Sequence, residues 1–382
     1  MSVPGRQVRH PLGYRYFVPN PLPPHLEWDA DLASILSEAD YNIGRLAAEG
    51  RGLPNPHLLL RPFIRREAVD SSRIEGTQAT LGELLAAEAG AAVERAPGDL
   101  KEVGNYVVAM ERGLDRLRKG KITLGLVRDL HRTLMTGVHE DRAKPGEFRT
   151  SQNWIGPPFS NLRTATYVPP APGEMRDGLQ AWAGFLKDRS LPPLVQIALL
   201  HYQFEAIHPF LDGNGRVGRL LIILFLVQRG ILPAPLLYLS AYFDATRPVY
   251  YAGLRGVTQT GNWYAWLRYF LTAVSVQADD AIRRAERINA LLGRWQRDAG
   301  GSSSSAESRI LELLAENPFL ILNRATQRLN VAFSTVMRAM ERLEKRKIIE
   351  EVSGRKRDRV YCAKKLLAIL EEPPRITPAS EN

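Results

Sequence analysis

One stretch of twelve residues decides how this chain is organised: His208-Pro-Phe-Leu-Asp-Gly-Asn-Gly-Arg-Val-Gly-Arg219. It opens with an imidazole, the side chain whose unperturbed pKa lies nearest neutral pH, and it holds one carboxylate, Asp212. Two glycines flank Asn214, so the backbone can turn sharply there and approach a ligand closely. The nearly continuous apolar run at 217–228 is typical of a buried helix. The sequence therefore predicts a tight loop that leads into a buried helix.

Such a junction favours an anion, because the first N–H groups of a helix and its dipole point toward the loop. Arg216 and Arg219 stand in the first turn, where positive charge is unfavourable unless an anionic ligand lies between them. Guanidinium groups suit phosphate oxygens, and a carboxylate beside phosphates suits Mg²⁺. We expect His208 to transfer a proton, Asp212 to bind a metal, and the arginines and amides to bind a polyphosphate. The alternative is a core histidine, a solvated turn and two surface arginines.

The stretch resembles the signature of the Fic family, His-Pro-Phe-x-Asp-Gly-Asn-Gly-Arg-x-x-Arg, at every fixed position. The resemblance implies an enzyme that transfers AMP from ATP to a Ser, Thr or Tyr hydroxyl of a target protein. It implies that His208 is the general base and that Asp212 holds Mg²⁺ on the α- and β-phosphates. The remaining nucleotide-binding residues that it implies are Gly213, Asn214 and Gly215 as an anion hole, and Arg216 and Arg219 on the β- and γ-phosphates.

Composition narrows the class of protein. A length of 382 residues allows two or three domains, and 45% hydrophobic with 24% charged residues is ordinary for a soluble globular chain. The single cysteine, Cys362, excludes an internal disulfide and fits a reducing cytoplasm. No apolar run reaches transmembrane length, and the N-terminus lacks a signal-peptide core. We expect a cytoplasmic protein without a membrane contact.

The N-terminal third is predicted to be mostly helical. Residues 1–27 are rich in proline and aromatics and indicate an extended arm, and 32–48 show helical spacing of apolar residues. A short helix is expected through 67–77. Thr80 and Glu83, three residues apart, predict a capping box for the next helix.

Ser71, Glu75 and Gly76 lie in the segment at about 66–76 that resembles the inhibitory helix of many Fic proteins. The resemblance implies that Glu75 pairs with Arg219 and so keeps this arginine from the γ-phosphate, because a carboxylate and a phosphate compete for the same guanidinium. Removing Glu75 should then release the enzyme. An exposed acid at a helix end is the alternative. Removal of AMP by the same site, with Glu75 orienting a water, is also open.

Two further parts of the site follow from the resemblance. Residues 144–172 contain many prolines and glycines, which indicates a loop or hairpin, and in the Fic family this position holds a β-hairpin flap that clamps the target. Tyr250 and Tyr251 resemble an aromatic pair that lines the adenine pocket; a half-core role is the alternative. The flap residues counted with the nucleotide-binding set are Thr166, Tyr167 and Val168, for which a plain surface loop is the alternative.

The segment 306–370 looks like a separate unit, with three helices and two strands around the basic turn at 354–359. This order is similar to a winged helix-turn-helix. Residues 342–365 hold ten Lys/Arg against four Asp/Glu, so +6 of the chain's net +10 lies there. The charge predicts DNA contact through 324–361. An interaction or dimer module is the alternative, and a homodimer stays open.

We therefore predict an all-α fold: a Fic helical domain with a hairpin flap and a small C-terminal winged helix. Two other functions remain: a Fic-fold transferase for another nucleotide, and a DNA-binding regulator whose Fic site senses a nucleotide. The predicted parts are an N-terminal helical region at 1–110, the catalytic domain at 111–280, a helix and Gly/Ser linker at 281–305, the winged helix-like domain at 306–370 and a tail at 371–382.

Overall fold

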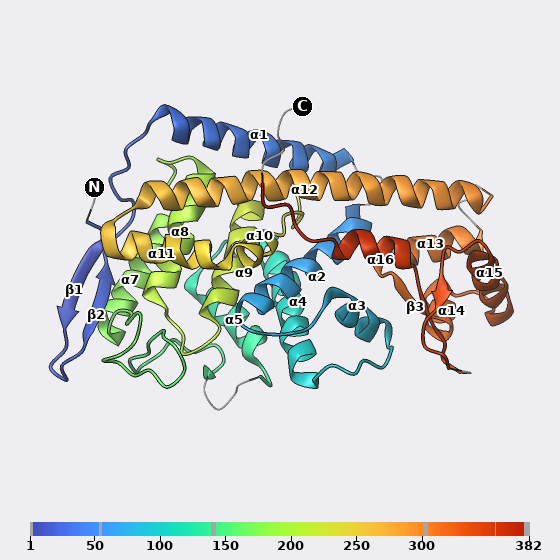
Figure 1. Cartoon of the computed structure of the whole chain (residues 1–382), viewed down its shortest axis with the longest axis horizontal. Helices are drawn as coiled ribbons and strands as arrows, with labels where there is room; N and C mark the ends of the chain where they lie inside the picture. Colours follow the sequence, from blue (N-terminus) through green and yellow to red (C-terminus); the bar gives the residue numbers. More distant parts are fainter. Residues whose placement is uncertain (1–2, 53–55, 139–142, 301–304, 356, 378–382) are drawn as a thin grey trace.

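The chain forms an elongated, mainly helical molecule, as predicted (Figure 1). The computed structural model describes residues 3–52, 56–138, 143–300, 305–355 and 357–377. The long helix α12 (Trp263–Asp298) runs along the molecule, and α1 (Ala30–Gly52) packs beside it. No helix among the described residues is long and apolar enough to cross a membrane.

The remaining helices of the larger part lie below α12 in Figure 1. They are α2 (Pro56–Ile74), α3 (Leu81–Ala89), α4 (Pro97–Leu117), α5 (Leu124–Met135), α7 (Pro172–Phe185), α8 (Pro193–Ile207), α9 (Asn214–Gln228), α10 (Ser240–Ala245) and α11 (Arg247–Thr260).

Helices α8 and α9 form the centre of the core, because both are apolar on nearly every face. Proline at the first position of α8 costs no hydrogen bond there. Gly113 of α4 permits close packing on α9, since a Cβ at this position would lie 2.7 Å from Leu224 Cδ1. The loop between α8 and α9 is thereby held at a fixed place in the molecule.

Helix α2 carries polar groups into this core. The carboxylate of Glu67 accepts hydrogen bonds from the backbone N–H and the hydroxyl of Ser240 and from the Tyr106 hydroxyl. The predicted capping box is confirmed at the start of α3: Thr80 Oγ1 accepts from the Glu83 N–H, and the Glu83 carboxylate accepts from the Thr80 N–H. The cap therefore fixes the end of the turn that leads into α3.

The N-terminal arm is extended, as predicted, and part of it forms a hairpin of β1 (Gly5–Arg9) and β2 (Arg15–Pro19). This hairpin supports the 154–168 loop, because the Phe17 N–H donates to Val168 O at 2.9 Å. Within 143–172 the predicted flap hairpin has only one antiparallel bridge, Ile155 to Tyr167. Prolines at 157–158 and 169–170 lack the N–H groups that a longer ladder requires.

The C-terminal unit follows the predicted order of helices and strands, with an added first strand and last helix. Its three strands pair antiparallel in the order β3-β5-β4. It contacts the larger part through α2, α3 and α12. Its elements are α13 (Ala306–Glu316), β3 (Phe319–Ile321), α14 (Leu322–Leu329), α15 (Phe333–Lys345), β4 (Glu350–Glu351), β5 (Val360–Cys362) and α16 (Lys364–Glu371).

Two boundaries drawn from the sequence fall inside continuous helices. The boundary after residue 110 lies within α4, and the boundary after residue 280 lies within α12. Charge rises along α12, but residues 263–292 contain no glycine or proline that would end the helix. Residues 301–304 of the predicted linker, Lys356 of the basic turn and residues 378–382 of the tail lie outside the described residues.

Arg66 of α2 ties the end of the C-terminal unit to the core. Its guanidinium donates to Leu370 O at 2.5 Å and to Glu372 O at 2.7 Å, and it lies over the Tyr238 ring. We expect Arg66→Ala to lower the free energy of unfolding by about 2–3 kcal/mol, because buried carbonyls lose a charged donor. Urea unfolding followed by circular dichroism measures this.

The matched control is Arg61→Ala on the same helix. Arg61 pairs with Glu316 at 3.2 Å, but half of its side chain is exposed. We expect a loss of about 0.5 kcal/mol there. Equal losses for the two variants would contradict the anchoring role of Arg66.

Candidate active site

The loop between α8 and α9 is shaped by its own residues. His208 ends α8 in the left-handed conformation with φ of 49°, and Gly213 precedes α9 with φ of 76°. Asn214 is buried; its Oδ1 accepts from the Phe210 N–H at 2.8 Å and its Nδ2 donates to Phe210 O at 2.9 Å. The Asn214 side chain thus supports the loop and has both polar atoms in use. Only the backbone of this residue, at the start of α9, remains to contact a ligand.

Arg149 supports the loop from behind, although the sequence did not single it out. It is almost fully buried and donates to His208 O at 2.9 Å and to Pro170 O at 2.5 Å. Burial lowers the pKa of Arg149 to about 10, so it keeps its charge at neutral pH. Its partners are backbone carbonyls, which leave no signal in a sequence.

His131 also supports the loop between α8 and α9, and the sequence did not predict this role. The Gly146 N–H donates to its Nδ1 at 2.9 Å, so Nε2 carries the proton and donates to Asp212 O at 3.0 Å. The ring also stacks on Phe210 with 3.7 Å between centroids. Burial lowers the pKa of His131 to about 4, so the ring stays neutral. The carbonyl of Asp212 is therefore held in place by His131.

His208 is neutral at physiological pH. Burial lowers its pKa to about 4, opposed by the Glu205 carbonyl and assisted by the charge of Arg149. Its Nδ1 lies 3.3 Å from Glu205 O, the distance of a weak hydrogen bond that favours the proton on Nδ1. The Nε2 lone pair is then the one that can accept a proton, as a general base requires.

Glu75 and Arg219 lie together, as predicted from 144 residues apart in sequence. Arg219 Nη2 donates to Glu75 Oε1 at 2.6 Å, and Nε donates to Ser71 Oγ at 2.9 Å. Burial by itself raises the pKa of Glu75, but the charge of Arg219 outweighs this and holds the pKa below its usual value. Glu75 follows the last residue of α2, and Gly76 has φ of 110°, a conformation that suits glycine.

Arg216 is also paired, with a residue that the sequence missed. Its Nη1 donates to Glu102 Oε2 of α4 at 2.9 Å, and its side chain is buried. The Nε atom has no hydrogen-bond partner within the described chain. Both arginines of the motif therefore face a carboxylate in this structure, and Arg216 retains an unused donor.

Asp212 is the residue that could hold Mg²⁺. Its side chain is 43% exposed, and Oδ1 accepts from the Gly213 N–H at 2.6 Å. The described residues contain no cluster of three or more His, Cys, Asp or Glu with metal-binding geometry. Mg²⁺ beside phosphates usually takes one or two carboxylates, with phosphates and waters as the other ligands, so a single exposed carboxylate fits it.

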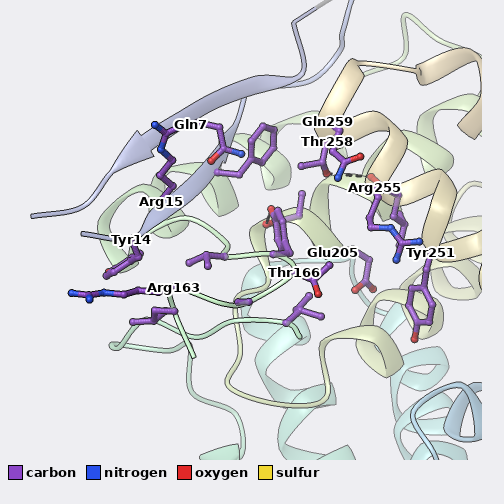
Figure 2. Close-up of a pocket in the computed structure, with 18 of the residues that line it drawn as sticks. Gln7, Tyr14, Arg15, Arg163, Thr166, Glu205, Tyr251, Arg255, Thr258 and Gln259 are labelled. Atoms are coloured by element: carbon purple, nitrogen blue, oxygen red, sulfur yellow. Dashed lines mark hydrogen bonds between the residues drawn. The ribbon is translucent and has the colours of Figure 1, made fainter. Parts of the chain in front are cut away.

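A cavity of about 570 Å³ opens at the last turn of α8, where Glu205 and Ala206 line it (Figure 2). Its walls come from α8, α11, the 154–168 loop and the N-terminal hairpin. Thr166, Tyr167 and Val168 all line it, and Tyr167 is fixed by its hydroxyl, which donates to Ala206 O at 2.6 Å. The structure thus brings the predicted flap residues to the same space as the end of α8.

Only one of the two tyrosines of α11 lies where the sequence predicted. Tyr251 lines the cavity, but Tyr250 is 1% exposed and its hydroxyl lies 2.8 Å from His201 Nε2 in the core. Successive residues of a helix point about 100° apart, so one tyrosine faces the cavity while its neighbour faces inward. Of the pair, the structure therefore places Tyr251 alone at the cavity.

We expect Arg149→Ala to destabilise the fold by about 3 kcal/mol or more, since several buried carbonyls lose one charged donor. Arg163→Ala is the control: Arg163 is exposed and donates to Leu12 O. It should change stability by less than about 0.5 kcal/mol. Chemical denaturation measures both variants, and an Arg149→Ala midpoint equal to that of the control would refute the supporting role.

Comparison with protein families finds two matches in this part of the chain. Residues 33–115 match the N-terminal domain of the Fic/DOC family, and residues 121–226 match the Fic/DOC family domain. The second match contains His208, Asp212 and Arg219, and the first contains Ser71 and Glu75.

Curated relatives and solved structures agree with these matches. The chain is 37% identical to protein adenylyltransferase Fic of Drosophila grimshawi over 31% of this chain and 23% of the relative. It is 29% identical to protein adenylyltransferase fic-1 of Caenorhabditis briggsae over 55% of this chain and 39% of the relative. The chain thus matches only about a quarter to two fifths of the length of these relatives.

The structural comparison confirms the predicted mainly helical Fic fold, while the winged helix at the C-terminus stays a prediction. A Fic family protein from Desulfovibrio desulfuricans has a TM-score of 0.60 at 21% identity and covers 90% of this chain and 98% of its own. Fic-1 of Caenorhabditis elegans has a TM-score of 0.51 at 22% identity, covering 67% of this chain and 74% of its own.

Proposed function

Since this chain belongs to the Fic/DOC family, we propose that it is a protein adenylyltransferase, which transfers AMP from ATP to a Ser, Thr or Tyr hydroxyl of a target protein. The observation that carries the proposal is the neutral, half-buried imidazole of His208, which lies between the N-terminus of α9 and the last turn of α8, where Glu205 and Ala206 line an open cavity. The names of the relatives support the same activity.

In the proposed reaction the target hydroxyl oxygen attacks the α-phosphorus. The new P–O bond forms as the bond to the β-phosphate oxygen breaks, so pyrophosphate leaves. His208 Nε2 accepts the hydroxyl proton, which a histidine with a pKa of about 4 can do throughout the neutral range. Arg216 and Arg219 stabilise charge on the phosphates, which is the main demand of such a transfer.

Asp212 is the proposed ligand of Mg²⁺, since its partly exposed carboxylate stands at the mouth of the anion-binding turn. A bound Mg²⁺ would neutralise charge on the phosphates. The exposed loop residue Thr166 lies at the cavity, where a target segment would reach His208. We place the reaction in the cytoplasm, because the buried Cys362 is a free thiol.

Glu75 is the proposed inhibitor. Its carboxylate occupies the Nη2 edge of Arg219 at 2.6 Å, and a γ-phosphate needs this same edge. The Ser71 hydroxyl accepts from Arg219 Nε, and the Ser71 carbonyl accepts from the same Nη2 that donates to Glu75. Nucleotide would therefore bind productively only after Glu75 leaves.

The test is label transfer from α-³²P-ATP and, separately, γ-³²P-ATP in Mg²⁺ to protein. Wild type should label protein weakly. Glu75→Gly should label at least about tenfold more protein, because a loss of about 1.4 kcal/mol in the competition between Glu75 and the γ-phosphate for Arg219 changes nucleotide binding by a factor of ten. The label should come from the α-phosphate only. Adding His208→Ala or chelating Mg²⁺ should abolish the label.

Label from the γ-phosphate would instead indicate phosphate transfer. An increase for Glu75→Gly that persists with His208→Ala would remove the proposed general base. Glu75→Asp is a matched variant, since its shorter carboxylate keeps the charge but cannot reach Arg219 without a shift of the backbone.

We also propose that the C-terminal unit binds duplex DNA. Helix α15 lies at the far end of the molecule from the N-terminal hairpin (Figure 1). Ser334, Thr335 and Arg338 are exposed along its first turns, where a recognition helix contacts base edges. The hairpin beside it exposes Arg355, Arg357 and Arg359, which suit phosphates. The competing hypothesis is that this basic surface binds an acidic protein instead of DNA.

The DNA proposal is tested with a triple variant, Arg355→Ala with Arg357→Ala and Arg359→Ala. Fluorescence anisotropy with a 24-base-pair duplex should show weaker binding and a salt slope reduced by about 2 to 3, because each phosphate contact contributes about 0.9. A matched variant in which Arg112 and Arg116 of α4 and Arg118, which follows this helix, are changed to Ala removes the same charge. Equal effects in both variants, or no binding by wild type, would exclude this interface.

A further inference from the structure

Glu205 is a titratable residue of the cavity to which the proposed mechanism gives no side-chain role. It lies on the last turn of α8, three residues before His208, and it lines the cavity between Thr166 and Tyr251 (Figure 2). Its Oε1 atom is buried and has no hydrogen-bond partner within the described chain. A buried carboxyl oxygen without a partner costs free energy, which points to a partner that arrives with a ligand.

The backbone of α9 fixes where this carboxyl lies. A Cβ on Gly218 would collide with Glu205 Oε1, and a Cβ on Gly215 would collide with Glu75 Oε1. Residues three apart on a helix lie on one face, about 5–6 Å apart. Glu205 and Glu75 therefore lie against neighbouring turns of the same face of α9, and Arg219 interacts with both.

We propose that the Glu205 carboxyl group is a further nucleotide-binding group of this site, and that its partner is an acceptor oxygen of the bound nucleotide. The inference rests on the proposed function, because it assumes a nucleotide on this face of α9. Since the neighbouring ligand is a polyanion, the group binds as a neutral acid that donates a hydrogen bond. An ionised Glu205 would repel the same ligand.

The surroundings keep Glu205 protonated. Burial raises its pKa to about 8, with Arg219 lowering it and Glu75 raising it. The groups that face it are Glu75 from α2, His201 and His208 from α8, Arg219 from α9, and Tyr250 and Tyr251 from α11. Both histidines stay neutral with pKa values of about 3 and 4, so neither changes charge between pH 7 and 9.

The affinity for ATP should decrease as the pH rises. Below pH 8 Glu205 is protonated and can donate a hydrogen bond to the nucleotide. Above pH 8 Glu205 is ionised, so it must take up a proton before it can donate this hydrogen bond. For a group with a pKa of about 8, ATP affinity should fall about tenfold from pH 7 to pH 9, and the fall should be larger in a chain without Glu75, because the charge of Glu75 raises this pKa. Glu205→Gln, a permanently neutral donor of the same shape, should bind ATP with no such fall. Glu205→Ala should bind more weakly at pH 7 and also show no fall.

The experiment is calorimetric titration of the full chain carrying Glu75→Gly with ATP in Mg²⁺ at pH 7 and pH 9. Glu286→Gln, an exposed glutamate of α12, is the control and should behave like its parent. Titration with 2′-deoxy-ATP distinguishes the acceptor: loss of the pH dependence identifies a sugar oxygen, and its retention identifies a phosphate oxygen. Circular dichroism confirms that each variant is folded.

Equal affinity and equal pH dependence in the parent, Glu205→Gln and Glu205→Ala would overturn the proposal. The result is independent of catalysis, because binding is measured without transfer. A chain that binds ATP through Glu205 but labels no protein would reject the adenylyltransferase and keep this inference.

Discussion

The buried charge of Arg219 is the constraint on which the site depends. A guanidinium almost fully removed from water must be matched by carboxylates, hydroxyls or phosphates, since an unpaired buried charge is strongly destabilising. In the free chain Glu75 and Ser71 meet this need from α2. A triphosphate could meet it equally well. Under the proposed function, the contact between Arg219 and Glu75 and the binding of a triphosphate to Arg219 would exclude each other.

The position of α2 is in turn set by contacts on several sides. Glu67 is held by Ser240 and Tyr106 within the core, while Arg66 holds the end of the C-terminal unit. Helix α3 adds a further contact, because Asn317 of the C-terminal unit donates to Leu85 O. The helix that leads to Glu75 is therefore also one of the three helices through which the two parts of the molecule meet.

The sequence predicted the features that are local or that belong to a dense motif. The loop and helix at 208–228 and the capping box of α3 depend on residues that are neighbours in the sequence, so the sequence alone shows their pattern. The pairing of Glu75 with Arg219 spans distant residues and was reached only through the resemblance to a family. Arg149 and Glu102 could not be found, because their partners come from other elements. The inward turn of Tyr250 depends on how α11 packs.

The geometry of α2 makes Glu75 sensitive to small rotations. From Arg61, which contacts the C-terminal unit, to Glu75 the chain advances about 21 Å at 1.5 Å per residue. Such a length acts as a lever: a tilt of about 3° at the Arg61 end displaces the Glu75 end by about 1 Å. A hydrogen bond of 2.6 Å stretched by that amount passes the limit of useful geometry. A tilt of a few degrees in α2 is thus enough to separate this carboxylate from its arginine.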